Sequence, residues 1–145
     1  MVTRANIVAA ARAQIGVPFA HQGSDPATGL DCRGLVEWVA FLLWQRPIPP
    51  RKYQRIPSGR EFREKLTAEM DEIPVAEARD GDVVLIKLPR HDEARHAGIL
   101  FTGIYEPMIV HAFERYRPGY VREEPYRGWT AGRTVAAFRF RGVID

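Results

Sequence analysis

One cysteine and two histidines are the residues of this chain whose types and spacing suit nucleophilic catalysis. Cys32 is the only cysteine, and it opens the apolar segment 32–44 directly after the turn-forming run 23–29. The first turn of a helix presents N–H groups and a positive dipole end, which favour thiolate over thiol. His96 and His111 follow in two strand-like segments. This order predicts a cysteine hydrolase; the alternative is that Cys32 only fills space, because free cysteine is among the most buried residue types.

Length and composition indicate an ordinary soluble domain. At 145 residues the chain is expected to form one domain over residues 1–145, and 46% hydrophobic with 27% charged residues is typical of globular proteins. A lone cysteine forms no internal disulfide. The segment 1–12 is interrupted by arginine and indicates no signal peptide, and no stretch approaches the ~20 apolar residues that span a bilayer. We therefore expect no membrane partner.

The net charge of +3 comes with basic residues that are nearly all arginine, a residue suited to carboxylate and phosphate contacts. Local basic excess occurs at 46–55 and 115–133. The second segment interleaves aromatic side chains that could stack on bases, and it also contains or adjoins three glutamates that weaken a nucleic-acid interpretation. These aromatic residues are Tyr116, Tyr120, Tyr126 and Trp129, and the glutamates are Glu114, Glu123 and Glu124. We expect no nucleic-acid partner.

Hydrophobic periodicity predicts helices followed by strands. Helices are expected over 4–14, 32–44 and 59–70, and strands over 83–88, 97–102, 108–113 and 134–139. This order predicts an α+β fold with helices packed on an antiparallel sheet. The segment 32–44 is apolar nearly all round, as expected of a central buried helix with Cys32 at its N-terminus. Residues 46–57 hold four prolines and indicate an extended surface excursion.

Several of these segments together resemble the NlpC-type cell-wall cysteine peptidases, which have a compact papain-like fold. The resemblance rests on five features in the same order: residues 11–19, 31–36, 81–84 and 96–99, and the later His111. The tripeptide His21-Gln22-Gly23 and the closing segment 135–140 are more similar to the phage-tail and gene-transfer-agent subgroup than to the secreted bacterial enzymes.

The resemblance implies roles for specific residues. Cys32 attacks a peptide carbonyl, and amides at the helix start, including its own, stabilise the oxyanion. His96 takes the thiol proton and later returns a proton to the leaving amine. His111 orients His96 and fixes its tautomer. Asp31 is either a helix cap or a ligand of a substrate ammonium group.

The sequence departs from the family pattern at three positions near the nucleophile. Phe19 stands in the substrate site where a tyrosine is usual, and it lacks the hydroxyl that would bind substrate or the oxyanion. His21 stands where a tryptophan is common and is either a substitute hydrogen-bond donor to substrate or a surface histidine. Arg33 replaces a small serine beside Cys32 and is expected to pair either with a substrate carboxylate or with Glu37 one turn along. These departures bear on substrate specificity more than on reaction class.

A metal site is the minority interpretation of the same histidines. His91, Asp92 and His96 together with Cys32 are ligand types for zinc, but their spacing matches no recognised zinc motif. We therefore expect no metal and no cofactor.

The leading expectation is an endopeptidase that cuts the stem peptides of peptidoglycan as a phage-type tail crosses the cell wall, with tail proteins as partners. It would be made in the cytoplasm, delivered by a virion-like particle, and act in the periplasm or cell wall. Two alternatives stay open. One is a different papain-fold amidase or acyltransferase of the effector kind, and the other is a tail-tip structural module with weak turnover, which is retained because of the Phe19 departure.

Overall fold

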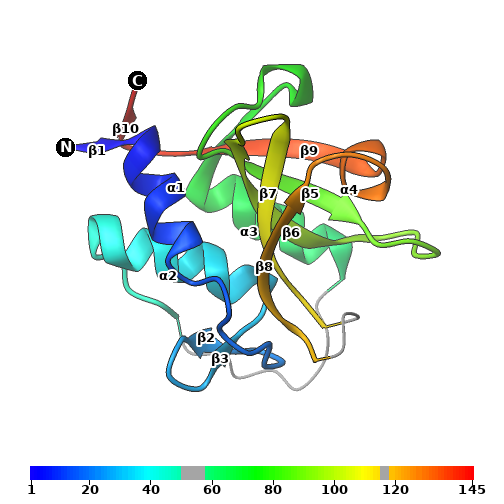
Figure 1. Ribbon diagram of the computed structural model, residues 1–145, viewed down its shortest axis with the longest axis horizontal. Helices are drawn as coiled ribbons and strands as arrows, with labels where there is room; N and C mark the ends of the chain where they lie inside the picture. Colours follow the sequence, from blue (N-terminus) through cyan, green and yellow to red (C-terminus); the bar gives the residue numbers. More distant parts are fainter. Residues whose placement is uncertain (50–57, 115–117) are drawn as a thin grey trace.

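A six-stranded antiparallel sheet forms the centre of the computed structural model, which describes residues 1–49, 58–114 and 118–145 (Figure 1). The strand order is β4-β9-β5-β6-β7-β8, so the last long strand of the chain is inserted between two earlier ones. The bounds are β4 Met70–Ile73, β5 Val83–Lys87, β6 Ala94–Thr102, β7 Pro107–Phe113, β8 Tyr120–Pro125 and β9 Thr134–Phe140.

Three long helices occur in the predicted order, and two short helical turns accompany them. Their bounds are α1 Arg4–Arg12, α2 Cys32–Trp44, α3 Gly59–Glu69 and the single turn α4 Trp129–Gly132, with a short 3-10 helix, η1, at Val75–Glu77. Two small strand pairs complete the fold: β1 (Val2–Thr3) is parallel to β10 (Val143–Ile144), and β2 (Ser24–Asp25) is antiparallel to β3 (Gly29–Leu30). No helix in the described ranges is long and apolar enough to cross a membrane.

The predicted fold class, α+β with helices on an antiparallel sheet, is confirmed. The three long helices and the four expected strands are present with shifted ends: α1 ends at Arg12 rather than at residue 14, and β6 begins at Ala94. Of the expected excursion over 46–57, residues 46–49 contain no helix or strand, and 50–57 lie outside the described residues.

The main core lies between the helices and one face of the sheet. Its largest fully buried side chains include Ile7 of α1, Leu35 of α2 and Phe138 of β9. A smaller cluster covers the opposite face. It is made of Val84, Ile86, Leu100, Ile109 and Ala137, with Tyr126 and Trp129 packed against it. The sheet is therefore buried on both faces around its central strands.

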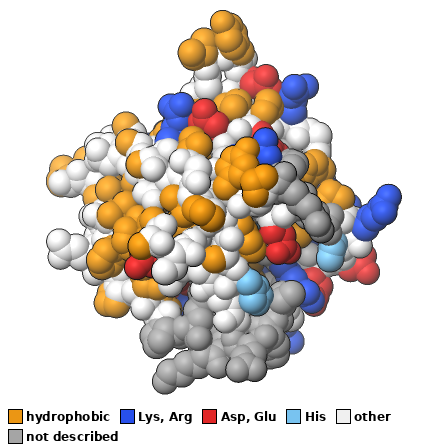
Figure 2. All heavy atoms as spheres, turned by 60° about the horizontal axis from the view of Figure 1, so that its bottom comes forward, with side chains coloured by type: hydrophobic (Ala, Val, Ile, Leu, Met, Phe, Trp, Pro, Cys, Tyr) orange, Lys and Arg blue, Asp and Glu red, His pale blue; other side chains and the backbone are white. Residues whose placement is uncertain are grey.

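The expectation that α2 is buried all round is wrong for its C-terminal end. Leu35 and Val39 are fully buried, whereas Phe41 is 40% and Leu42 44% exposed. The helix covers the sheet with one face only, so the apolar residues on its outer face remain at the surface. Hydrophobic side chains gather on the left of the face in Figure 2, on the side where Figure 1 shows this end of α2.

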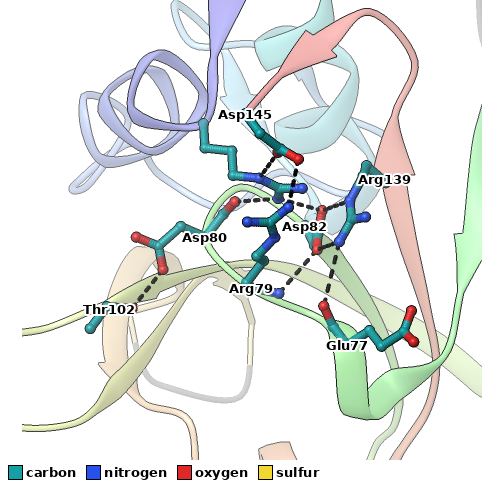
Figure 3. A network of polar contacts seen from close by, with 8 residues as sticks. Glu77, Arg79, Asp80, Asp82, Thr102, Arg139 and Asp145 are labelled. Carbon is teal, nitrogen blue, oxygen red and sulfur yellow. Dashed lines mark hydrogen bonds and ion pairs between the residues drawn. The ribbon is translucent and has the colours of Figure 1, made fainter.

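A buried carboxylate ties the two ends of the chain to the start of β5 (Figure 3). Asp82 is 1% exposed and accepts hydrogen bonds from Arg4 Nη1 at 3.0 Å and from Arg139 Nε and Nη2 at 3.0 and 2.8 Å. The backbone N–H of Arg79 donates to it at 3.0 Å. Asp145 pairs with Arg4 at 2.7 Å and with Arg79 at 2.6 Å. The Gly-Asp turn therefore holds α1, β5 and β9 together.

Candidate active site

Cys32 occupies the first position of α2, as predicted. Asp31 is the N-cap: its Oδ1 accepts from the Gly34 N–H at 2.7 Å and its Oδ2 from the Gln22 N–H at 3.1 Å. Both carboxylate oxygens thus fix backbone next to the cysteine, and the capping alternative for Asp31 is observed. The Cys32 thiol lies 3.6 Å from the carbonyl oxygen of Arg95. The sulfur therefore faces the start of β6, one residue from His96.

Gly34 allows the loop before the helix to pack closely on its first turn. A Cβ at this position would lie 1.9 Å from the carbonyl oxygen of Gly23. That same oxygen accepts the Asp31 N–H at 3.1 Å. No side chain fits between these two backbones, so the glycine sets the approach of the loop to the residues around Cys32.

His96 of β6 and His111 of β7 form a buried, directly hydrogen-bonded pair. His96 Nε2 lies 2.6 Å from His111 Nδ1, and the residues are 3% and 0% exposed. Burial lowers the pKa of His96 well below 6.5, and the neighbouring His111 lowers it further. The imidazole of His96 is therefore neutral at pH 7, the form that can accept a proton.

Two aromatic rings cover the histidine pair. The Trp129 ring centroid lies 6.1 Å from each imidazole, and Phe113 lies 5.3 Å from His96 and 5.6 Å from His111. Trp129 and Phe113 are themselves 5.2 Å apart. The sequence offered Trp129 only as a base-stacking residue; its place in the aromatic cluster follows from the unpredicted turn α4.

The remaining residues expected to bind substrate have separate surroundings. Phe19 is half-buried, and its N–H donates to the Gly119 carbonyl at 2.9 Å. His21 is exposed in the turn that follows. Arg33 Nε pairs with Glu37 at 2.7 Å, and both side chains are largely buried. The second alternative given for Arg33 is thus the observed contact.

The structure also places the residues on which the metal-site and nucleic-acid interpretations rest. His91 and Asp92 lie between β5 and β6, and within the described ranges no three His, Cys, Asp or Glu side chains gather as metal ligands. Tyr116 and part of each arginine-rich segment lie outside the described residues. In the described part of 115–133, Arg127 pairs with Glu106 at 3.0 Å, and Glu123 pairs with Arg12, also at 3.0 Å.

One residue near the site was missed as a functional candidate. Glu124, on β8, lies with its Oε1 3.5 Å from His111 Nε2. Nothing in the spacing of residues 111 and 124 indicates this contact, because it depends on the pairing register of β7 with β8.

Solved structures of similar fold include a peptidoglycan hydrolase domain, an NLP/P60-family protein and an amidase. The NlpC/p60 domain of the peptidoglycan hydrolase SagA is 24% identical with a TM-score of 0.67, over 96% of this chain and 100% of that one. A lipoprotein-like NLP/P60-family protein from Staphylococcus aureus is 19% identical with a TM-score of 0.65, over 98% of this chain and 42% of that one. An N-acetylmuramoyl-L-alanine amidase from Bacteroides uniformis is 12% identical with a TM-score of 0.64, over 95% and 98%.

Comparison by sequence gives the family. No match was found among curated protein sequences. The model of the NlpC/P60 family, however, matches residues 16–132, which include the nucleophile candidate and both histidines. The structural neighbours share the papain-like arrangement of helices on an antiparallel sheet. The chain therefore belongs to the NlpC/P60 family of hydrolases.

Proposed function

We propose that this protein is a cysteine endopeptidase or amidase that cleaves amide bonds in the stem peptides of peptidoglycan. One observation carries the proposal. Cys32 stands at the start of α2 with its sulfur 3.6 Å from the carbonyl oxygen of Arg95, the residue before His96, and His96 is hydrogen-bonded to His111. A nucleophile, a base and a group that orients the base are thereby available on three neighbouring elements.

Acylation uses the His96 nitrogen that does not contact His111. Nε2 of His96 is engaged at 2.6 Å, so Nδ1 takes the proton of the Cys32 thiol. The thiolate attacks the carbonyl carbon of the substrate amide, and the Cys32 N–H in the first turn of α2 stabilises the oxyanion. The tetrahedral intermediate collapses to a thioester when His96 returns the proton to the leaving amine.

Deacylation runs the same proton path with water. His96 removes a proton from a water molecule, and the resulting hydroxide attacks the thioester carbonyl. The C–S bond breaks, the acid product leaves, and the proton on His96 restores the Cys32 thiol. His111 holds the imidazole plane and its tautomer through both halves of the cycle.

Four further residues are proposed to shape the substrate site from the loop and helix start around Cys32. Phe19 supplies an apolar contact in place of the usual tyrosine, and the exposed His21 supplies a polar one. Asp31 and Arg33 act through the local structure: Asp31 fixes the loop and helix start, and Arg33 neutralises Glu37 beneath them.

We further propose that the enzyme acts as part of a phage-type tail or gene-transfer particle. The resemblance of residues 21–23 and 135–140 to that subgroup supports this assignment. A particle would carry the enzyme to the cell wall, and its tail proteins would be its partners.

Digestion of purified sacculi tests the activity. Wild-type protein should release peptide-bearing fragments identifiable by mass spectrometry, while Cys32→Ala should release none and retain the wild-type melting temperature. His91→Ala is the matched control, since its side chain lies in the loop outside the histidine pair and should leave release unchanged. New amino groups within stem peptides indicate an endopeptidase, and whole stem peptides freed from muramic acid indicate an amidase.

Equal release by wild type and Cys32→Ala would refute the assignment. So would products cleaved only between sugars, because a thiolate–imidazole pair performs acyl transfer rather than glycoside hydrolysis.

A further inference from the structure

An acidic side chain lies beside the outer ring nitrogen of the second histidine. His111 is 0% exposed, and its Nδ1 contacts His96. Within the described residues, its Nε2 has no hydrogen-bond partner, and Glu124 Oε1 lies 3.5 Å away. That distance is a few tenths of an ångström longer than a hydrogen bond. It is the distance of a close ion pair when the imidazole is charged.

The pairing of β7 with β8 brings this carboxylate to the histidine. His111 lies opposite Arg122, and Ile109 lies opposite Glu124. Residues two apart on a strand share a face, so Glu124 is a diagonal neighbour of His111 on the adjacent strand. Glu123 points to the other face and pairs with Arg12 of α1 at 3.0 Å. Adjacent glutamates on β8 therefore have different partners on opposite faces of the sheet.

We infer that Glu124 is a positioning residue that sets the order of protons along the His111–His96 pair; the inference rests on the proposed function. A carboxylate beside Nε2 of His111 favours the tautomer that carries its hydrogen there. Nδ1 of His111 is then an acceptor for the hydrogen on Nε2 of His96. Nδ1 of His96 is consequently the unprotonated nitrogen, as the transfer of the Cys32 proton requires.

The opposite tautomer would disable the pair. With its hydrogen on Nδ1, His111 would donate to Nε2 of His96, and the hydrogen of His96 would move to Nδ1. No lone pair would then be available for the thiol proton. Because two neutral imidazoles bonded through single nitrogens allow either order, an external group must select one, and Glu124 is the nearest carboxylate that the contacts of His111 show.

The carboxylate also balances the charge that forms during catalysis. The groups that face His111 are His96 on β6, Glu124 and Arg122 on β8, and the rings of Phe113 and Trp129. Arg122 Nε lies 3.8 Å from Glu124 Oε2. Glu124 therefore lies beside both a permanent cation and His111, which is hydrogen-bonded to the His96 imidazole that gains a proton when the thiolate forms. The aromatic rings keep water away from the pair.

Two variants distinguish the effect of Glu124 on the tautomer from the effect of its charge: Glu124→Leu removes both the charge and the hydrogen-bond acceptor, whereas Glu124→Gln removes only the charge. Glu123→Gln on the opposite face is the control. Ring ¹⁵N chemical shifts of the free protein report which nitrogen of His96 and His111 carries hydrogen. The rate of Cys32 alkylation by iodoacetamide, measured from pH 5 to 9, reports thiolate formation. Neither measurement needs a substrate. The inference can therefore fail while cell-wall cleavage is observed, and cell-wall cleavage can fail while the inference holds.

In wild type both histidines should carry hydrogen on Nε2. Glu124→Leu should populate Nδ1–H on both rings and slow alkylation at pH 7 by about 10- to 100-fold, the usual cost of removing an orienting partner. Glu124→Gln should keep the wild-type tautomers through its amide oxygen and slow alkylation less than Glu124→Leu. Glu123→Gln should match wild type in both readouts. Unchanged ring shifts and alkylation profiles in folded Glu124→Leu, or an equal loss in Glu123→Gln, would overturn the inference.

Discussion

Removal of the Asp82 carboxylate should destabilise the fold far more than removal of a surface carboxylate. Asp82 is 1% exposed and accepts hydrogen bonds from two guanidinium groups, those of Arg4 and Arg139. Truncating one partner of a buried ion pair costs about 3–5 kcal/mol, because the remaining charges stay desolvated. The Arg4 and Arg139 side chains are 12% and 26% exposed, which places Asp82→Ala near the lower end, at about 3 kcal/mol.

The assay is urea unfolding together with calorimetry, with Asp71→Ala as the matched variant. Asp71 pairs with Arg141 at 3.0 Å, but both side chains are about half exposed or more. Such a pair contributes at most about 1 kcal/mol. A loss of about 3 kcal/mol in a domain of this size lowers the melting temperature by roughly 10 °C. If the two variants lose the same free energy of unfolding, the argument that burial magnifies this network is refuted.

Three further outcomes are expected. Gly34→Ala should displace the start of α2, because its Cβ would lie 1.9 Å from the Gly23 oxygen. A displacement of about 1 Å at the nucleophile lowers turnover by about 100-fold, which digestion of sacculi would measure. His111→Ala should lose more turnover than His111→Asn, since an amide still accepts the His96 proton; equal inactivity of the two folded variants would contradict an orienting role. Because burial lowers the pKa of His96, the unfolded chain binds a proton at a higher pH than the folded chain does. The free energy of unfolding should therefore decrease as the pH falls below 6.5. Urea unfolding at several pH values should show a flatter pH dependence for His96→Gln than for wild type.

The sequence predicts those elements whose apolar pattern reflects burial directly. The run Val83–Lys87 is buried on both faces and lies within the predicted strand 83–88. The predicted helix 59–70 begins at Gly59, where the side chain of Ser58 accepts from the Glu61 N–H at 3.1 Å. Strand β8 was missed because its middle, Arg122 to Glu124, contains no apolar residue. Its polar side chains have partners on both faces of the sheet, and such partners are visible only once the strands are paired.

The same limit applies to the candidate site. The sequence indicates Cys32, His96 and His111 because cysteine and histidine are rare in this chain and each of the three stands in a distinct local setting. The role inferred for Glu124 could not be anticipated, since four glutamates between 106 and 124 look alike in sequence. Only the register that sets Ile109 opposite Glu124 distinguishes it from its neighbours.

The position of β9 between β4 and β5 determines when the sheet can be completed during synthesis. β4 and β5 are only nine residues apart in the chain, yet neither pairs with the other, and both pair with residues 134–140. A ribosome that has released the chain up to β8 has therefore exposed two strands whose shared partner is still inside the exit tunnel. Most pairings made at that stage are local hairpins, and closing the sheet requires the long-range contacts that slow folding. Nascent chains lacking β9 should bind chaperones and hold no structured candidate site, so the site forms only after residues 134–140 have left the tunnel.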